Sequence, residues 1–239
     1  MKKLFIPLAA GVLYVCFAFT TPTTANHPKN LLVDDSPVTS VSFPRAIVIY
    51  KEAALSDYGL NEEVFEIAYK GYQRLYEKGL IHSAVISICD FSQSSLKKRL
   101  YIIDLQESKL LRNTYVAHGK NSGLVYASRF SNKAASLASS LGFYSTACTY
   151  YGAHGLSLKL KGLEPGFNDQ AMARNIVVHG AAYVNGSRTK LGYLGRSFGC
   201  PAVPAAESAS IINTIKNGSC LFIYYPSREY LKGSKILNG

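Results

Sequence analysis

Residues 179–203 read HGAAYVNGSRTKLGYLGRSFGCPAV. The apolar run 176–178 before them predicts a short buried strand, with His179 at its end. Cys200 lies in a Gly-Cys-Pro turn, where Gly199 permits a tight loop. A cysteine nucleophile needs an imidazole that takes its proton and backbone N–H groups that point at the developing oxyanion. The stretch therefore predicts a hairpin-like return that brings a thiol nucleophile, Cys200, to its base, His179.

Short runs rich in β-forming residues surround this stretch and predict a mainly β domain of the α+β class. The segment 104–109, DLQESK, separates two of these runs and is typical of a hairpin turn. The runs cover residues 83–91, 100–105, 110–118, 142–150, 157–160, 176–179 and 220–225.

Two segments predict helices. Asn61 is a good N-cap for a helix that begins at Glu62 and ends before Gly79. Its apolar and aromatic residues recur at three- and four-residue spacing, which favours a single buried packing face over a surface that binds a ligand. Residues 205–215 favour a second short helix, packed beneath Cys200. We therefore expect an N-terminal helical region, residues 45–81, before a catalytic domain, residues 82–239.

The catalytic stretch resembles the L,D-transpeptidase (YkuD-like) catalytic domain, whose hallmark is a His-Gly pair followed by Ser-His-Gly-Cys. This chain has His179-Gly180 and then Ser197-Phe198-Gly199-Cys200. Phe198 replaces the second histidine, and Pro201-Ala202-Val203 replaces residues that include an arginine. The Gly-Cys-Pro-Ala-Val variant is similar to a murein L,D-transpeptidase subfamily of envelope bacteria, as are VAHGKNSG at 116–123 and SSLGFYSTACTYYGAHGLSLKL at 139–160. The resemblance covers residues 82–226 and implies a β-barrel or sandwich with a few peripheral helices.

The resemblance implies an enzyme that transfers an acyl group of a peptidoglycan stem peptide to the cysteine. Cys200 would be the nucleophile and His179 the general base, with the Gly180 carbonyl fixing the imidazole tautomer. Backbone N–H groups near Gly199 and Cys200 would bind the oxyanion. Ser197 would donate to the histidine or only shape the turn. An amine acceptor would make a crosslink, whereas water would make a carboxypeptidase or an endopeptidase.

Several further residues are candidates for substrate binding. His118 and His154, each followed by glycine, would line the groove or satisfy buried backbone groups. Tyr150 and Tyr151 lie in a segment shared with the subfamily and would bind amides or carboxylates of the peptide. Arg196 would hold a substrate carboxylate or form a surface ion pair.

Three alternatives stay open. A zinc peptidase is disfavoured because the three His-Gly pairs lack the short spacing of His-Glu-x-x-His, so we expect no metal and no cofactor. A papain-like thiol protease is disfavoured because the cysteine follows its histidine here. A non-enzymatic cell-wall-binding module with a degenerate site is suggested by Phe198 and Pro201.

The first 25 residues are typical of a secretory signal: Lys2 and Lys3 precede an apolar run, and Thr23-Thr24-Ala25 offers a cleavage site. A linker at 26–44 follows. We expect export across the inner membrane to the periplasm or cell envelope, with membrane attachment only through an uncleaved signal. Cleavage removes two lysines and no acid, which lowers the net charge from +11 to +9. The basic residues are dispersed and no nucleic-acid motif accompanies them, so this charge suits the anionic envelope, stem-peptide carboxylates or a solvated surface.

Four cysteines remain after cleavage, which is too few for a disulfide framework in a chain of 239 residues. Cys89 and Cys220 lie in strand-like runs and are expected in the core. A disulfide at Cys148 stays open, although a bridge to Cys200 would abolish the nucleophile.

Overall fold

The computed structural model describes residues 43–239. The predicted signal peptide and the predicted linker, apart from its last two residues, lie outside this range. Three helical elements come first: α1 (Phe43–Glu52), the 3-10 turn η1 (Leu55–Tyr58) and α2 (Glu62–Glu77). No helix among the described residues is both long and apolar enough to cross a bilayer.

One eight-stranded mixed sheet dominates the fold, with strand order β3-β2-β1-β8-β4-β5-β6-β7. The β1–β8 and β6–β7 pairs are parallel and the others are antiparallel. The strands are β1 (Val85–Asp90), β2 (Leu100–Asp104), β3 (Lys109–Thr114), β4 (Gly142–Gly152), β5 (Gly155–Gly162), β6 (Val177–Ala181), β7 (Ala202–Pro204) and β8 (Cys220–Tyr224). The remaining helices are η2 (Gly186–Leu191), α3 (Ala205–Ile215), α4 (Arg228–Gly233) and α5 (Lys235–Asn238).

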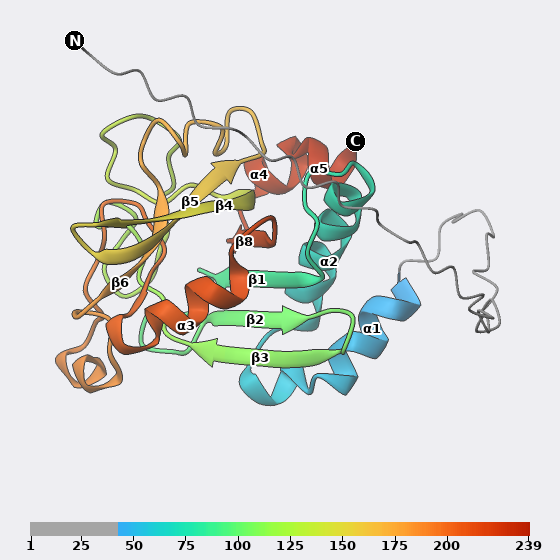
Figure 1. Cartoon of the computed structure of the whole chain (residues 1–239), viewed down its shortest axis with the longest axis horizontal. Helices are drawn as coiled ribbons and strands as arrows, with labels where there is room; N and C mark the ends of the chain where they lie inside the picture. Colours follow the sequence, from blue (N-terminus) through green and yellow to red (C-terminus); the bar gives the residue numbers. More distant parts are fainter. Residues whose placement is uncertain (1–42) are drawn as a thin grey trace, which may run out of the picture. The chain divides into compact units, whose positions relative to one another are not determined.

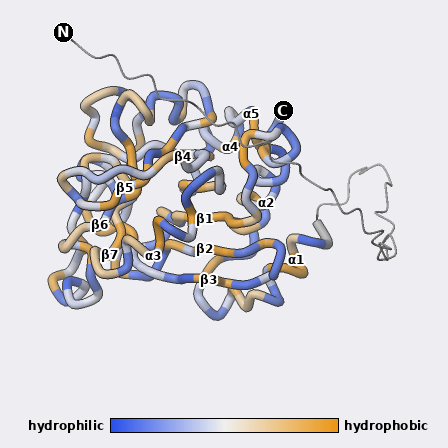
Figure 2. The backbone as a smooth tube through the Cα atoms, in the orientation of Figure 1, coloured by the Kyte–Doolittle hydropathy of each residue, from blue (hydrophilic) through white to orange (hydrophobic). Residues whose placement is uncertain are grey.

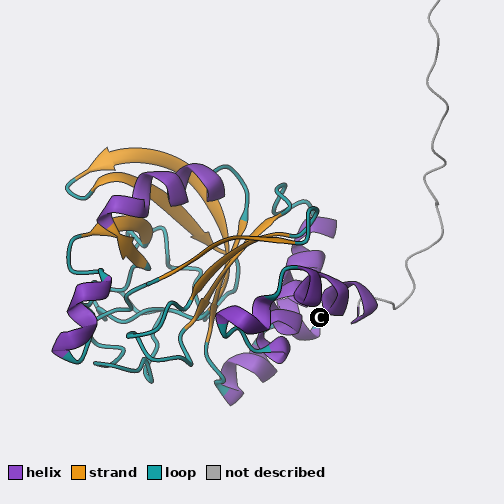
Figure 3. Cartoon of the chain, turned by 90° about the horizontal axis from the view of Figure 1, so that it is seen from below, coloured by secondary structure: helices purple, strands orange, loops and turns teal. Residues whose placement is uncertain are grey.

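The two edges of this sheet nearly meet, which gives a barrel-like fold. The chain leaves edge strand β3, and three residues later Ala117 pairs with Ala202 of the opposite edge strand β7. Their two N–H···O distances are 2.8 and 3.4 Å. The strands splay and curl accordingly (Figure 3), with α1 and α2 at one end and β4 to β6 at the other (Figure 1). This confirms the expected mainly β, barrel-like fold of the α+β class.

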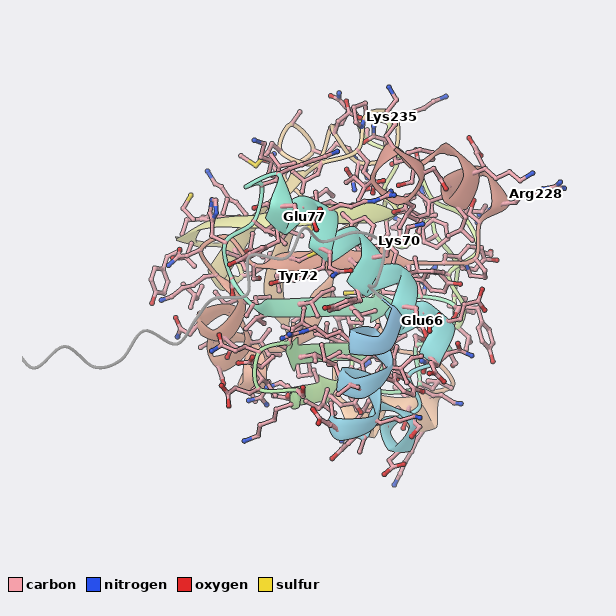
Figure 4. The ribbon with its side chains drawn as sticks, turned by 90° about the vertical axis from the view of Figure 1, so that its right-hand side faces the viewer. Glu66, Lys70, Tyr72, Glu77, Arg228 and Lys235 are labelled. Atoms are coloured by element: carbon pink, nitrogen blue, oxygen red, sulfur yellow. The ribbon has the colours of Figure 1, made fainter. Side chains whose placement is uncertain are left out.

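Helix α2 begins where the cap predicts, because the Asn61 side chain accepts a hydrogen bond of 2.8 Å from the Glu63 N–H. Its apolar face is buried, whereas Glu66, Lys70 and Glu77 lie on its outer side (Figure 4). Apolar residues concentrate on the strands and on α3 (Figure 2), which packs against β5, β6 and β7. This packing holds the strands that carry the catalytic stretch.

Candidate functional site

Strand pairing brings the predicted nucleophile and base together. His179 lies beside Ser157 of β5 and beside Ala202 of β7. Continuing that register two residues back places Cys200 beside Val177, whose N–H donates to Sγ at 3.5 Å. Residues two apart in a strand point to the same face. Both side chains therefore face one cavity.

That cavity has a volume of about 460 Å³ and contains basic, aromatic and polar groups but no carboxylate. Its lining consists of Tyr150, His154, Arg174, Asn175, Val177, His179, Tyr183, Arg196, Ser197, Phe198 and Cys200. The absence of an acid makes it suited to a substrate that carries carboxylates.

His179 is held as a neutral base. Its Nδ1 lies 3.0 Å from the Gly180 carbonyl oxygen, which only accepts, so Nδ1 carries the proton and Nε2 keeps its lone pair. The side chain is only 3% exposed. Burial is the largest cause that lowers its pKa, and the neighbouring His154 lowers it further, while the Gly180 hydrogen bond opposes both. The His154 ring stacks on it with centroids 4.2 Å apart and planes 22° apart.

Cys200 rests as a thiol in this structure. Its Sγ donates to the Asn175 carbonyl at 3.7 Å and accepts from the Val177 N–H. Burial raises the pKa of the thiol, whereas the Val177 N–H and the Arg174 charge lower it. Among the described residues no hydrogen bond joins Sγ to His179, and such contacts often tighten only when substrate binds.

In the turn 197–200, the N–H groups of Ser197 and Gly199 are already bound. Ser197 Oγ donates to the Cys200 carbonyl at 2.6 Å and accepts from the Gly199 N–H at 3.1 Å. Ser197 therefore shapes the turn and does not donate to the histidine. This corrects the expectation for Gly199, because its N–H is already bound. The N–H groups of Phe198 and Cys200 have no partner within residues 43–239, and the Cys200 N–H, on the residue that carries the sulfur, is the donor best placed for an oxyanion.

Gly199 needs to be glycine for two reasons. Its φ of +125° is a conformation that L side chains rarely adopt. A Cβ there would also lie 2.8 Å from the Ala138 carbonyl oxygen. The neighbouring Phe198 is 69% exposed at the cavity, and Lys120 Nζ lies 5.7 Å from its ring centroid.

His118 does not line the cavity, which corrects one of the two options that the sequence left open. It is 1% exposed, and its Nδ1 lies 2.7 Å from Nη2 of the fully buried Arg99. Burial and the Arg99 charge lower the pKa of His118 to about 3. Its carbonyl accepts from the Ser197 N–H at 3.0 Å, so His118 supports the catalytic turn through its backbone.

The other candidates divide. His154 is exposed at the tip of the β4–β5 hairpin and lines the cavity. Tyr151 does not: it is 84% exposed, and its neighbour Tyr150 lines the cavity instead. Arg196 lines the cavity, but Nη1 is bound to the Lys120 and Gly123 carbonyls at 3.0 and 3.2 Å, not to an acid.

Sequence reasoning named Tyr150 together with Tyr151 but missed Asn175 and Arg174 in the cavity wall. Arg174 is five residues before His179 in a loop without a motif, and only its tertiary contacts reveal it. Within residues 43–239 no three His, Cys, Asp or Glu side chains form a group that could hold a metal ion. The four cysteines in that range are free, with Cys89 and Cys220 buried as expected and Cys148 exposed.

Comparison with solved structures finds L,D-transpeptidases at low sequence identity. Solved structures that match include an L,D-transpeptidase from Mycobacterium smegmatis, with 13% identity and a TM-score of 0.37, covering 60% of this chain and 59% of that one. L,D-transpeptidase 3 from Mycobacterium tuberculosis matches with 10% identity and a TM-score of 0.38, covering 59% of this chain and 61% of that one. L,D-transpeptidase (Yku) from Stackebrandtia nassauensis matches with 12% identity and a TM-score of 0.37, covering 77% of this chain and 92% of that one.

The chain thus spans about three fifths of the length of the mycobacterial proteins. No curated protein matches its sequence. The sequence profile of the L,D-transpeptidase catalytic domain matches residues 56–224, well over half of the 239 residues. The chain therefore belongs to the L,D-transpeptidase catalytic domain family.

Proposed function

We propose that this protein is an exported L,D-transpeptidase-like enzyme that acts on peptidoglycan stem peptides through a Cys200 thioester. The observation that carries the proposal is the shared cavity of Cys200 and His179, in which His179 Nδ1 is bound to the Gly180 carbonyl at 3.0 Å. That hydrogen bond leaves the other ring nitrogen free to take the thiol proton.

In the first step the thiol proton moves to Nε2 of His179, and the sulfur attacks the carbonyl carbon of the scissile amide. The Cys200 N–H stabilises the oxyanion. The C–N bond then breaks, the imidazolium returns its proton to the leaving amine, and an acyl thioester remains on the sulfur. An acceptor amine that attacks the thioester restores the thiol and leaves a new amide, whereas water leaves a carboxylate.

Arg196 and His154 are the side chains that we assign to substrate binding. Both line the cavity, and Arg196 has Nε and Nη2 without a partner among the described residues. A guanidinium at the cavity wall suits a carboxylate of the stem peptide. The signal-like N-terminus and a mature net charge of +9 support an enzyme of the periplasm or cell envelope.

Acylation of the intact protein by a carbapenem, read by mass spectrometry, tests the nucleophile. We expect one adduct on the peptide that contains Cys200, no adduct in Cys200→Ser, and at least a tenfold slower reaction in His179→Ala. Cys148→Ser is the matched control, because Cys148 is an exposed free cysteine, and it should react at the wild-type rate. A folded wild-type protein without an adduct would favour a wall-binding module.

Muropeptide analysis after incubation with peptidoglycan then decides the reaction. New crosslinks support transpeptidation. Release of terminal D-amino acid without new crosslinks would replace it with a carboxypeptidase activity, and shortened crosslinks with an endopeptidase activity.

A further inference from the structure

Arg174, in the loop before β6, ties together a segment that lies below the nucleophile. Its Nη1 donates to the Ser131 carbonyl at 2.7 Å and to Ser140 Oγ at 3.3 Å. Its Nη2 donates to Ser136 Oγ at 3.1 Å and to the Ala138 carbonyl at 2.6 Å. All four acceptors are neutral, so these bonds fix the guanidinium in place without neutralising its charge.

No carboxylate balances that charge. Between residues 43 and 239 the one ion pair is Arg112–Glu207, and the cavity that Arg174 lines has no Asp or Glu. Arg174 is half-buried. A cation in such a place is stabilised when an anion forms beside it. The only acidic group in the cavity wall that the reaction ionises is the thiol of Cys200.

The guanidinium also lies close to Gly199, the residue before Cys200. A Cβ built on Gly199 would lie 3.2 Å from Arg174 Nη2 and 2.8 Å from the Ala138 carbonyl oxygen that Nη2 binds. Ser139 Oγ, in the same segment, donates to the Gly199 carbonyl at 3.1 Å. Segment 131–140, which Arg174 holds in place, therefore packs against the Gly199–Cys200 turn and supports it.

We propose that Arg174 is a positioning residue of the Cys200 nucleophile: it fixes segment 131–140 beneath the turn and supplies the positive charge that stabilises the Cys200 thiolate. The inference rests on the proposed function. The effect of the Arg174 charge on the pKa of Cys200, which is downward, agrees with it. When the thiol proton passes to His179, the new sulfur anion gains a counter-ion that needs no rearrangement.

The test is the pH dependence of iodoacetamide alkylation at Cys200 in the full chain. Cleavage after Arg196 and Lys216 releases a peptide with Cys200 as its one cysteine, so mass spectrometry reads this site alone. In Arg174→Gln we expect the alkylation midpoint to move up by about one pH unit, which is about a tenfold slower reaction at pH 7. Arg228→Gln, on the exposed end of α4, is the matched control and should keep the wild-type profile (Figure 4).

Arg174→Lys separates charge from anchoring. Because it keeps the charge but not the planar fork, it should retain the wild-type alkylation midpoint while the carbapenem acylation rate falls severalfold. Circular dichroism verifies that each variant is folded. If Arg174→Gln does not fold, the lysine variant decides: a midpoint that moves up as far as one pH unit would overturn the proposal.

An unchanged midpoint in folded Arg174→Gln would also overturn it. This result differs from failure of the proposed function, because alkylation needs neither peptidoglycan nor a carbapenem. If the wild-type protein is alkylated normally but is never acylated by the carbapenem, the enzyme assignment fails. The effect of Arg174 on the alkylation midpoint can still be measured in that case.

Discussion

The buried pair of Arg99 and His118 makes the folded protein sensitive to acid. His118 accepts a hydrogen bond of 2.7 Å from Arg99, and burial together with that neighbouring charge lowers the pKa of His118 to about 3. Its Nε2 is buried without a partner among the described residues. The native state therefore keeps this ring neutral at a pH where the unfolded chain protonates it.

The magnitude follows from the two pKa values. An unfolded histidine titrates near 6.5, so between pH 6.5 and pH 3 the unfolded state binds one proton that the native state does not. The contribution of neutral His118 to the free energy of unfolding is therefore complete above about pH 6.5 and is lost as the pH falls toward 3. At pH 4 the loss is about 3 kcal/mol, out of the roughly 5–15 kcal/mol that typically holds a domain folded.

Urea unfolding at pH 7.5 and pH 4, followed by circular dichroism, measures this effect in the wild type and in His118→Asn. The asparagine Oδ1 can accept from Arg99, so the variant should fold with a loss of about 1–2 kcal/mol at pH 7.5. Between the two pH values it should lose about 3 kcal/mol less than the wild type. His82→Asn, at an exposed histidine, should behave as the wild type. Equal acid losses in the wild type and His118→Asn would refute the reasoning.

Three further substitutions test the site and the core. Gly199→Ala should lower Cys200 acylation more than tenfold and stability by about 1–3 kcal/mol, because φ is +125° there; acylation assays and urea unfolding measure both. His154→Ala should raise the pKa of His179 and move the acidic limb of the acylation profile to higher pH, because the His154 ring lowers that pKa and covers the base; an NMR titration measures it. Gly71→Ala should cost about 1–3 kcal/mol in urea unfolding, because its Cβ would lie 2.0 Å from Phe143 Cζ.

Each of these has an outcome that contradicts it. Full acylation by Gly199→Ala would mean that the turn tolerates a side chain, and an unchanged or lower His179 pKa in His154→Ala would mean that the stack does not affect the base. Gly186→Ala is the control for Gly71→Ala, because its Cβ would come no closer than 3.4 Å to Tyr115. Equal losses in the two alanine variants would remove the packing argument.

Local pattern was enough to predict most of the sheet. The seven expected runs all contain strands, and the hairpin turn forms with Asp104 Oδ1 accepting from the Gln106 and Glu107 N–H groups. Strand β7 was missed because it has only three residues, follows Pro201 and ends in Pro204, which is atypical of a strand. Its pairing comes from the parallel neighbour β6 and from Ala117, both of which are tertiary.

In the site, the sequence predicted the residues that belong to a motif, but not the residues whose position depends on strand register. Cys200, His179 and Gly180 stand in the family pattern, but the choice between Tyr150 and Tyr151 depends on β4. The pairing of β4 with β5 shifts between Thr146 and Thr149, where β4 has one residue more than its partner. Such a bulge reverses the alternation of faces, so the periodicity of the strand cannot tell which tyrosine faces the cavity.

The buried pair and the catalytic turn are coupled through one residue, so acid should inactivate the enzyme in two separable ways. Protonation of His179 removes the base, and it reverses as soon as the pH is raised because the fold is unchanged. Protonation of His118 instead separates it from Arg99 and loosens the backbone carbonyl that binds the Ser197 N–H at 3.0 Å. Rapid return to neutral pH should therefore restore acylation at once after exposure to pH 5.5, but only at the rate of refolding after exposure to pH 2.5, which lies below the His118 pKa of about 3. Instant recovery from both would mean that the turn does not depend on the buried pair.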